Sequence, residues 1–396
     1  MKPRRFNRRT VPAFLAATAI LSGLYWWGSQ GFPMPGGGVP STKDRIVFVS
    51  DRAGADDLYL IEARDGAEPV ALTSDEMADR EPVFSDDGQL VVFTSNRQKD
   101  ALGRFAKGVV RQIFVMQAAP GRPVGQLTQT AASSATKQSP RYGAGRKVYF
   151  MDGGRVTSIR VDASEAAAVF PHLEQRRSNP LVSELFERGG VVEYDISPDG
   201  AWAAVVVQRE DDQVLVAYDI ENELPAAIGA GRTVHCRFVP DGTLAVAVAD
   251  GLPFQQPVVI GDEAASQVPS LAAIVPSSAG SAEGRNLFAR FRFGNELKAD
   301  GIVELPAEID GLAPAPDSSG VAVYGKGSKF QGLVIVRFGA GEAVPLVGDT
   351  VESVTFSPDG KRIAYASRGD IHVVGTDGSA PPINLTRGKG RNRQPA

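Results

Sequence analysis

Cysteine and histidine are scarce in this sequence. The 396 residues contain one cysteine, Cys236, and three histidines, His172, His235 and His372. One thiol forms no internal disulfide, so the fold must be stabilised by its apolar core. The histidines are scattered, and none belongs to an H-E-x-x-H motif or another paired ligand spacing. We therefore expect all four side chains to have structural roles.

Motifs of common enzyme classes are also missing. There is no G-x-S-x-G nucleophile elbow, and the GKGSK stretch at Gly325 lacks the upstream glycine of a phosphate-binding loop. A net charge of -4 argues against a general nucleic-acid binder. Three acidic pairs are expected to be solvated turns rather than calcium sites: Asp56-Asp57, Asp86-Asp87 and Asp211-Asp212. We predict no enzyme activity, no cofactor, no metal and no nucleic-acid partner.

One strongly apolar run of membrane-spanning length lies near the N-terminus. Residues 1–10 carry five basic side chains and no acid, and residues 11–27 carry no charge. At a helical rise of about 1.5 Å per residue, the second segment spans roughly 25 Å, which is enough for a bilayer core. The basic residues favour a cytoplasmic N-terminus, and Tyr25, Trp26 and Trp27 suit the outer interface. We predict a single-pass signal-anchor helix over residues 11–27.

A cleaved secretory signal is the alternative to this anchor. Ser29-Gln30-Gly31 is the nearest match to a cleavage site, but it is not an A-x-A sequence. Residues 28–43 are rich in glycine and proline without periodicity, as in a linker. We expect an inner-membrane protein whose residues 44–396 lie in the periplasm or outside the cell.

Glycine and proline are abundant, at 43 and 27 residues, and both recur in a repeated turn. The stretch VTFSPDGKRIAYAS from Val354 recurs as PVFSDDGQLVVFTS from Pro82, YDISPDGAWAAVVV from Tyr194 and CRFVPDGTLAVAVA from Cys236. Proline fixes φ at the first corner of such a turn, and glycine takes the left-handed position. Each copy therefore predicts a β-hairpin.

The spacing of the turns predicts a β-propeller. Weaker copies keep only the turn glycine, and the full set is Gly88, Gly145, Gly200, Gly242, Gly284, Gly320 and Gly360. A period near 40 residues suits a four-stranded propeller blade with loop insertions. These seven turns and one blade split between the chain ends predict eight blades. Seven is the alternative if the weak copy at Gly284 is not a blade.

The split blade is predicted from the two ends of the repeat region. RIVFVS, Arg45–Ser50, has the pattern of a second strand without a first, and NRQPA from Asn392 matches DREPV from Asp79. We expect residues 393–396 to pair with Arg45–Ser50 as the missing inner strand. Such closure removes the open edges of the ring, so residues 44–396 would form one all-β domain.

These repeats resemble the TolB-type, WD-like β-propeller repeat. The resemblance rests on the S-P-D-G turn at 357–360, the following I-A-Y strand, the S-x-R loops at 50–52 and 95–97, and the L-T pairs at 127–128 and 385–386. It covers roughly residue 44 to the end and implies a propeller fold. TolB has an α/β domain before a six-bladed propeller, whereas we expect only a linker before the first strand here.

Two insertions interrupt the repeat. Residues 98–111 separate the second and third strands of the second blade, and residues 171–190 follow the third blade and include a predicted helix at 181–188. Both should emerge on one face of the propeller. The predicted partner-binding residues there are Arg104, Phe105, Lys107, Arg111, Arg176, Arg177, Phe254 and Phe330. An apolar anchor inside a basic rim is typical of docking surfaces, although ordinary solvated loops are the alternative.

The leading functional hypothesis is a non-enzymatic, membrane-anchored interaction or scaffold module. Its expected partners are other membrane or envelope proteins, with the bilayer bound by residues 11–27. Small residues such as Ala16, Ala17 and Gly23 would let this helix pack against others. That favours an accessory subunit of a respiratory, photosynthetic or secretory complex. A soluble, TolB-like envelope protein released by signal cleavage is the alternative.

A propeller enzyme is the rival class. A lactonase or glycan-processing hydrolase would place carboxylates or histidines where inner strands begin, facing the central channel. The sequence offers Glu81, Glu193, His235 and Glu352 in comparable places. We interpret these as polar groups of the rim or the channel lining.

Overall fold

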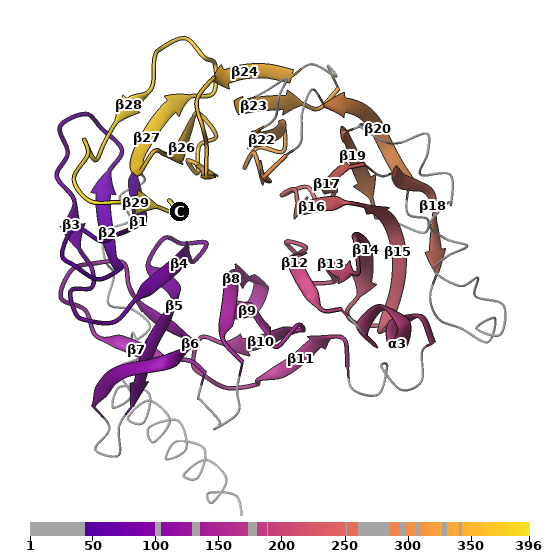
Figure 1. Ribbon diagram of the computed structural model, residues 1–396, viewed down its shortest axis with the longest axis horizontal. Coiled ribbons are helices and arrows are strands. Elements are labelled where there is room, and N and C mark those ends of the chain that lie inside the picture. Colours follow the sequence, from indigo (N-terminus) through magenta and orange to yellow (C-terminus); the bar gives the residue numbers. More distant parts are fainter. Residues whose placement is uncertain are drawn as a thin grey trace, which may run out of the picture.

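Within the described residues, seven antiparallel sheets surround a central axis and form a β-propeller (Figure 1). The computed structural model describes residues 44–99, 104–128, 135–172, 180–187, 189–250, 252–259, 286–293, 298–305, 309–326, 331–339 and 343–396. Six sheets have four strands, and the fourth gains a fifth strand. The predicted all-β propeller of four-stranded blades is confirmed.

The first four sheets are given from the axis outward. The first contains β29 (Asn392–Arg393), β1 (Arg45–Ser50), β2 (Asp57–Glu62) and β3 (Val70–Ala71). The second contains β4 (Asp79–Phe84), β5 (Leu90–Lys99), β6 (Phe105–Gln117) and β7 (Val124–Gln126). The third contains β8 (Lys137–Gly143), β9 (Lys147–Asp152), β10 (Val156–Arg160) and β11 (Ala167–Phe170). The fourth contains β12 (Val191–Ile196), β13 (Trp202–Arg209), β14 (Asp212–Asp219), β15 (Leu224–Gly231) and β18 (Leu252–Val259).

The remaining three sheets follow the same order. The fifth contains β16 (Thr233–Phe238), β17 (Leu244–Ala249), β19 (Asn286–Arg292) and β20 (Lys298–Leu305). The sixth contains β21 (Gly311–Pro314), β22 (Gly320–Lys326), β23 (Gln331–Arg337) and β24 (Ala343–Val347). The seventh contains β25 (Ser353–Phe356), β26 (Arg362–Ser367), β27 (Asp370–Gly375) and β28 (Ile383–Asn384). A 3-10 turn, η1 (Ala144–Arg146), joins β8 to β9, and helix α3 (Pro180–Glu187) precedes β12.

The repeated Ser-Pro-Asp-Gly turn closes the hairpin from an inner strand to its neighbour. In the seventh sheet, the Ser357 hydroxyl donates to the Asp359 carboxylate at 2.6 Å and accepts from the Arg362 N–H at 3.0 Å. Gly360 has a φ of 70°, the left-handed conformation that other residues rarely adopt. The same Ser–Asp hydrogen bond recurs at Ser85 and Ser197. The short motif therefore fixes the start of the second strand in the second, fourth and seventh sheets.

The prediction of eight blades is wrong, and the seven-bladed alternative is confirmed. β19, which follows Gly284, pairs with β17 as the third strand of the fifth sheet, with Asn286 opposite Ala249. The segment between them is an insertion, and its strand β18 adds to the outer edge of the fourth sheet by pairing with β15. Gly284 itself lies outside the described residues. In the sequence, Gly284 followed by an apolar strand has the pattern of a hairpin turn that begins a new blade. The strand instead pairs with β17 and belongs to the fifth sheet.

The core lies between adjacent sheets. β1 shows why its sequence is apolar at nearly every position, because successive side chains of a strand point to opposite faces. Ile46 and Phe48 pack in a cluster shared with the seventh sheet, whereas Val47 and Val49 pack in a cluster shared with the second sheet. Both faces of the strand are therefore buried between neighbours.

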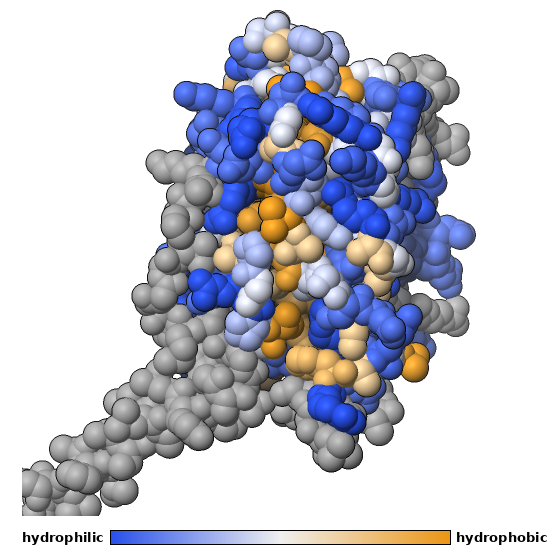
Figure 2. Space-filling model, turned by 90° about the vertical axis from the view of Figure 1, so that its left-hand side faces the viewer, coloured by the Kyte–Doolittle hydropathy of each residue, from blue (hydrophilic) through white to orange (hydrophobic). Residues whose placement is uncertain are grey.

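The outer wall formed by the first and last sheets is mostly hydrophilic (Figure 2). Apolar exceptions occur on the outer strands, where Val70 on β3 is 49% exposed and Ile383 on β28 is 40% exposed. Scattered apolar side chains of this kind are ordinary on folded proteins. Figure 2 also shows apolar residues at the surface along the middle of this face, between hydrophilic regions.

The ring closes where β29 pairs with β1. Val49 lies opposite Arg393 and Ser50 opposite Asn392. The Val47 N–H donates to the Ala396 carbonyl at 3.1 Å, and the Ala396 N–H donates to the Val47 carbonyl at 2.9 Å. The first sheet thus takes its inner strand from the end of the chain.

Among the described residues, no helix is both long enough and apolar enough to cross a bilayer. Helix α3 has eight residues. It lies where the sequence predicted a short helix after the third blade. The predicted transmembrane segment, residues 11–27, with its interfacial residues Tyr25, Trp26 and Trp27, falls outside the described residues.

Asn392→Ala should weaken the closure of the ring. Asn392 is buried, its side-chain amide donates to the Gly369 carbonyl at 2.9 Å, and its oxygen accepts from Arg52 Nη2 at 2.9 Å. Losing these bonds should lower the free energy of unfolding by about 2–4 kcal/mol, measured by urea titration. The control Asn222→Ala changes an exposed turn residue and should cost less than about 0.5 kcal/mol. Equal effects of the two substitutions would contradict the closure argument.

Candidate functional site

Three neighbouring inner strands carry the same irregularity beside the central channel. Gln394, Glu81 and Ser139 each precede a proline and have φ values of 52°, 53° and 52°. The register of β4 and β8 shifts at these positions, which marks a β-bulge. The Glu81 N–H donates to Gln394 Oε1 at 3.0 Å, and the Ser139 N–H donates to Glu81 Oε2 at 3.2 Å. The bulges therefore link the first three sheets around the axis.

The third to fifth sheets bring five ionisable side chains together on their inner strands. Arg141 lies on β8, Glu193 and Asp195 lie on β12, and His235 and Arg237 lie on β16. Residues two apart share a face of a strand, so the pairs on β12 and β16 form two facing columns. Glu193 accepts from Arg237 Nη1 at 2.5 Å and contacts His235 Nδ1 at 2.8 Å. Arg141 Nε lies 3.6 Å from Asp195 Oδ1.

The two carboxyl groups of this cluster differ in acidity. Burial opposes the ionisation of Glu193, but the Arg237 charge and the hydrogen bonds from His235 and the Cys236 N–H lower its pKa to about 2. For Asp195, burial outweighs the nearby arginine charges, and its pKa is raised. Glu193 is therefore the ionised centre of the cluster.

His235 and Cys236 are both engaged within the protein. His235 Nδ1 lies 2.8 Å from Glu193 Oε2, and Nε2 lies 3.1 Å from the backbone oxygen of Ile309, so both ring nitrogens face an oxygen of the protein. Cys236 is buried, and burial raises the pKa of its thiol. A buried, protonated thiol is a poor nucleophile. The histidine is placed as a link between the fourth, fifth and sixth sheets.

A cavity of about 600 Å³ occupies the central channel. Its lining extends from Gln394 on the first sheet to the hairpin turn at Pro358 on the seventh. Arg141, Arg237 and Glu81 are the charged residues of this lining, and the others are apolar or neutral. Cavities of this size hold small organic molecules or a short peptide segment.

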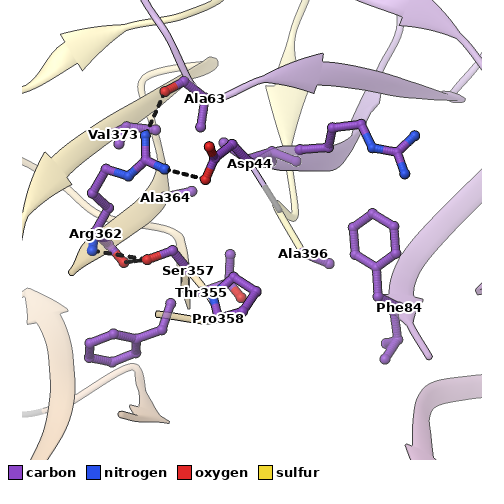
Figure 3. Close-up of a pocket in the computed structure, with 14 residues that line it drawn as sticks. Asp44, Ala63, Phe84, Thr355, Ser357, Pro358, Arg362, Ala364, Val373 and Ala396 are labelled. Atoms are coloured by element: carbon purple, nitrogen blue, oxygen red, sulfur yellow. Dashed lines mark hydrogen bonds and ion pairs between the residues drawn. The ribbon is translucent and has the colours of Figure 1, made fainter. Parts of the chain in front are cut away.

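A second pocket, of about 310 Å³, lies beside the joint between the first and last sheets (Figure 3). Arg362 spans this joint, because Nη2 pairs with Asp44 Oδ1 at 2.7 Å and Nη1 donates to the Ala63 carbonyl at 2.8 Å. Phe84 and Pro358 supply part of its apolar wall. The ion pair reinforces ring closure at the edge of the pocket.

The S-x-R motif on β5 of the second sheet holds an ion-pair cluster that is buried except for Asp75. The carboxylate oxygens of Asp57, Asp75 and Asp79 lie within 4.8 Å of one another. Arg97, which is 2% exposed, pairs with Asp75 at 2.6 Å and also pairs with Asp79. Burial, with the charges of Asp79 and Asp75, raises the pKa of Asp57 to about 6. Arg97 therefore supplies the positive charge beside three closely spaced carboxylates.

The predicted insertion in the second sheet is an extension of β5 and β6, which we call the arm (residues 97–99 and 105–111). Arg97 pairs with Lys107, and Lys99 pairs with Phe105. The next pair is Ser95 with Gln112, so residues 108–111 form a bulge in β6. Val109 in this bulge is 98% exposed. The structure therefore presents paired strands where the sequence predicted an inserted loop.

Phe105, which is predicted from the sequence to be an apolar anchor for a partner, packs against its own sheet. It is half-buried, and its ring lies edge-on to Phe114 with centroids 5.8 Å apart. Arg104 and Lys107 are exposed, and Arg111 is half-buried. Val109, rather than Phe105, is the exposed apolar side chain of this segment. Sequence alone did not distinguish them, because burial of one side of the hairpin depends on its pairing register.

The other predicted site residues separate into three groups. Arg176, Arg177 and Phe330 lie outside the described residues. Phe254 lies in β18, an outer strand of the fourth sheet rather than a loop. Four residues were considered for an enzyme. Glu193 contacts His235, Glu81 accepts a hydrogen bond from the bulge at Ser139, and Glu352 is exposed. These four side chains therefore do not form one group.

Structural similarity, rather than sequence similarity, links this chain to known proteins. No protein-family model matches the sequence, and no curated protein matches it. A puromycin hydrolase is similar at a TM-score of 0.57 and 15% identity, over 88% of this chain and 52% of that chain. A Mycobacterium tuberculosis puromycin-hydrolyzing peptidase is similar at 0.56 and 14%, over 90% and 52%. TolB from Acinetobacter baumannii is also a structural neighbour, at 0.46 and 15%, over 95% and 70%.

These likenesses show the propeller fold alone. The chain spans about half the length of each of the two hydrolases. TolB and other propeller proteins are among its structural neighbours. The propeller fold that the resemblance of the repeats implied is the fold observed. Enzymes and proteins described without an activity both occur among the neighbours, so the fold does not decide between these classes.

Asp57→Asn should remove a loss of stability that the wild type shows as the pH rises. The folded-state pKa of Asp57 is about 6 and the ordinary value is 3.8, so the folded chain binds this proton more tightly. Ionisation therefore destabilises the wild type as the pH rises between these values, and the loss is complete above about pH 6. The stability of the variant relative to wild type should increase by roughly 2–3 kcal/mol from about pH 4 to about pH 7, measured by urea titration.

Asp359→Asn is the matched control for this pH dependence. Hydrogen bonds from Ser357 and the Lys361 N–H lower the pKa of Asp359, so this substitution should show the opposite trend with pH. A difference between Asp57→Asn and wild type that stays constant over the same range would show that Asp57 does not titrate in this way.

Proposed function

We propose that this chain is a non-enzymatic interaction module that docks a partner protein through the arm. The observation that carries the proposal is Val109, which is 98% exposed. Arg104 and Lys107, which precede it in the sequence, are exposed and basic. An exposed apolar side chain within a basic rim fits a partner that offers a small apolar pocket with acidic edges.

The arm is longer than its sheet needs, and two of its residues contact other parts of the protein. β5 has ten residues and β6 has thirteen, whereas every other described strand has eight or fewer. Phe105 packs on Phe114, and Arg97 forms ion pairs with Asp75 and Asp79. A preordered docking element loses little conformational entropy on binding, which supports recognition by this arm.

Two arrangements favour binding over catalysis. Glu193 and His235 are committed to contacts within the protein, and the thiol of Cys236 is buried. A general base needs a free lone pair within reach of a substrate. A hydrolase using the channel is the second class, favoured only by the Glu193–His235 contact.

The proposal includes retention at the inner membrane through residues 11–27, with the propeller in the periplasm or outside the cell. The basic residues 1–10 and the uncharged run after them support this orientation. A membrane-held propeller would suit an accessory subunit of a larger membrane complex. A soluble envelope protein after signal cleavage is the competing arrangement.

Val109→Ser should weaken partner capture without altering the fold. Washed membranes would be extracted with mild detergent, and the subunits that co-purify with the full chain would be quantified. The substitution should reduce their recovery by an amount on the order of 1–2 kcal/mol in affinity, because the apolar anchor is lost. The melting temperature should not change.

Val70→Ser is the control, since Val70 is 49% exposed on β3, the outer strand of the first sheet, whereas the arm belongs to the second sheet. Equal recovery from both variants would reject the arm as the docking element. The first extraction step tests the location: a chain released from membranes by high salt, or one beginning near Phe32, would reject the anchor.

A further inference from the structure

We propose that the central cavity binds a carboxylate group through the guanidinium groups of Arg141 and Arg237. The inference concerns a different surface from the arm, so it stands or falls independently of partner docking there. The two arginines come from β8 and β16, on either side of the fourth sheet, and both line the cavity of about 600 Å³.

The charges of the lining favour an anion. Its charged residues are two arginines and Glu81. The Glu81 carboxylate is already engaged, because Oε2 accepts from the Thr94 hydroxyl at 3.1 Å and from the Ser139 N–H at 3.2 Å. Among the side chains of the lining, two positive charges therefore stand against the one negative charge of Glu81.

Each guanidinium group donates to the protein through Nη1 and has further N–H donors for a ligand. Arg237 Nη1 donates to Glu193 and to the Cys236 carbonyl, and Arg141 Nη1 donates to the Pro140 carbonyl. Within the described part of the chain, Nη2 of either arginine has no hydrogen-bond partner. A guanidinium fixed on one side and open on the other is prepared to bind carboxylate oxygens.

The opposite wall supplies neutral contacts. Gln394, Thr355 and Tyr324 bring an amide and two hydroxyl groups to the same cavity, and burial raises the pKa of the Tyr324 hydroxyl, which keeps it a donor. Pro314 and Phe356 add apolar surface. These contacts suit a carboxylate on a small, partly apolar body. The carboxylate belongs either to a free organic acid or to an acidic segment of a protein.

Calorimetric titration of the full chain in mild detergent tests the site. The probes are succinate and a blocked tetraglutamate peptide, with a blocked tetraglutamine peptide as the neutral counterpart. At least one carboxylate probe should bind, and binding should weaken as salt increases. Succinate binding alone identifies a free acid as the source, and peptide binding alone identifies an acidic segment. Binding of tetraglutamine as strong as that of tetraglutamate, or binding of no probe, would overturn the proposal.

Arg141→Gln should weaken binding of the probe that binds the wild type at least tenfold. Arg141→Lys should retain part of the affinity, because lysine keeps the positive charge but lacks the two parallel N–H donors of a guanidinium group. Arg141 is the suitable position because it is 30% exposed and its ion-pair contact with Asp195 is 3.6 Å long. The control is Arg160→Gln, on β10 of the same sheet and 37% exposed, which should change affinity less than twofold. Equal affinities for Arg141→Gln and Arg160→Gln would place binding elsewhere.

Discussion

The backbone pairing of β29 with β1 is the interaction on which the rest of the ring depends. It joins parts of the chain that are 340 residues apart, as in the contact between Arg52 and Asn392. Closing so long a loop carries a large entropic cost, so a few hydrogen bonds have to act together with apolar packing. Arg362 adds an ion pair with Asp44 across the same joint. With this joint closed, both faces of the first sheet are covered.

A closed ring places different demands on the inner strands than on the outer ones. Side chains between sheets pack against a neighbour, whereas side chains facing the axis meet other inner strands or the space between them. Ionisable groups there require partners, because burying an unpaired charge is costly. Glu193 meets this requirement through Arg237, His235 and the Cys236 N–H. The same geometry leaves a cavity in which the far sides of the arginines are open.

Local turn chemistry predicted much of the fold. The Ser-Pro-Asp-Gly hairpins and the match of NRQPA to DREPV led us to expect a propeller with its joint at the chain ends, and the structure contains that pairing. The number of blades was wrong because β19 has the pattern of a hairpin strand, while its pairing with β17 bridges an insertion. Pairing over such a distance leaves no local signal.

The candidate site was less predictable than the fold. Sequence identified Glu193 and His235 as channel-facing, but their contact depends on the relative height of two strands in different sheets. Arg141 and Arg237 had no motif to distinguish them from other arginines. In the arm, the order of Phe105 and Val109 was clear, but their opposite burial follows from a bulge that only the pairing register reveals.

Native-state hydrogen exchange at the Val47 amide tests the central claim most directly. This N–H donates to Ala396 across the joint, whereas the Val323 amide lies in β22, a strand whose neighbours are close in the sequence. If the joint opens only when the ring unfolds, Val47 should exchange with the free energy of global unfolding, as for the slowest amides of the core. Exchange of Val47 by a local opening of about 2 kcal/mol or less, while Val323 stays protected, would show that the ring is stable without its joint.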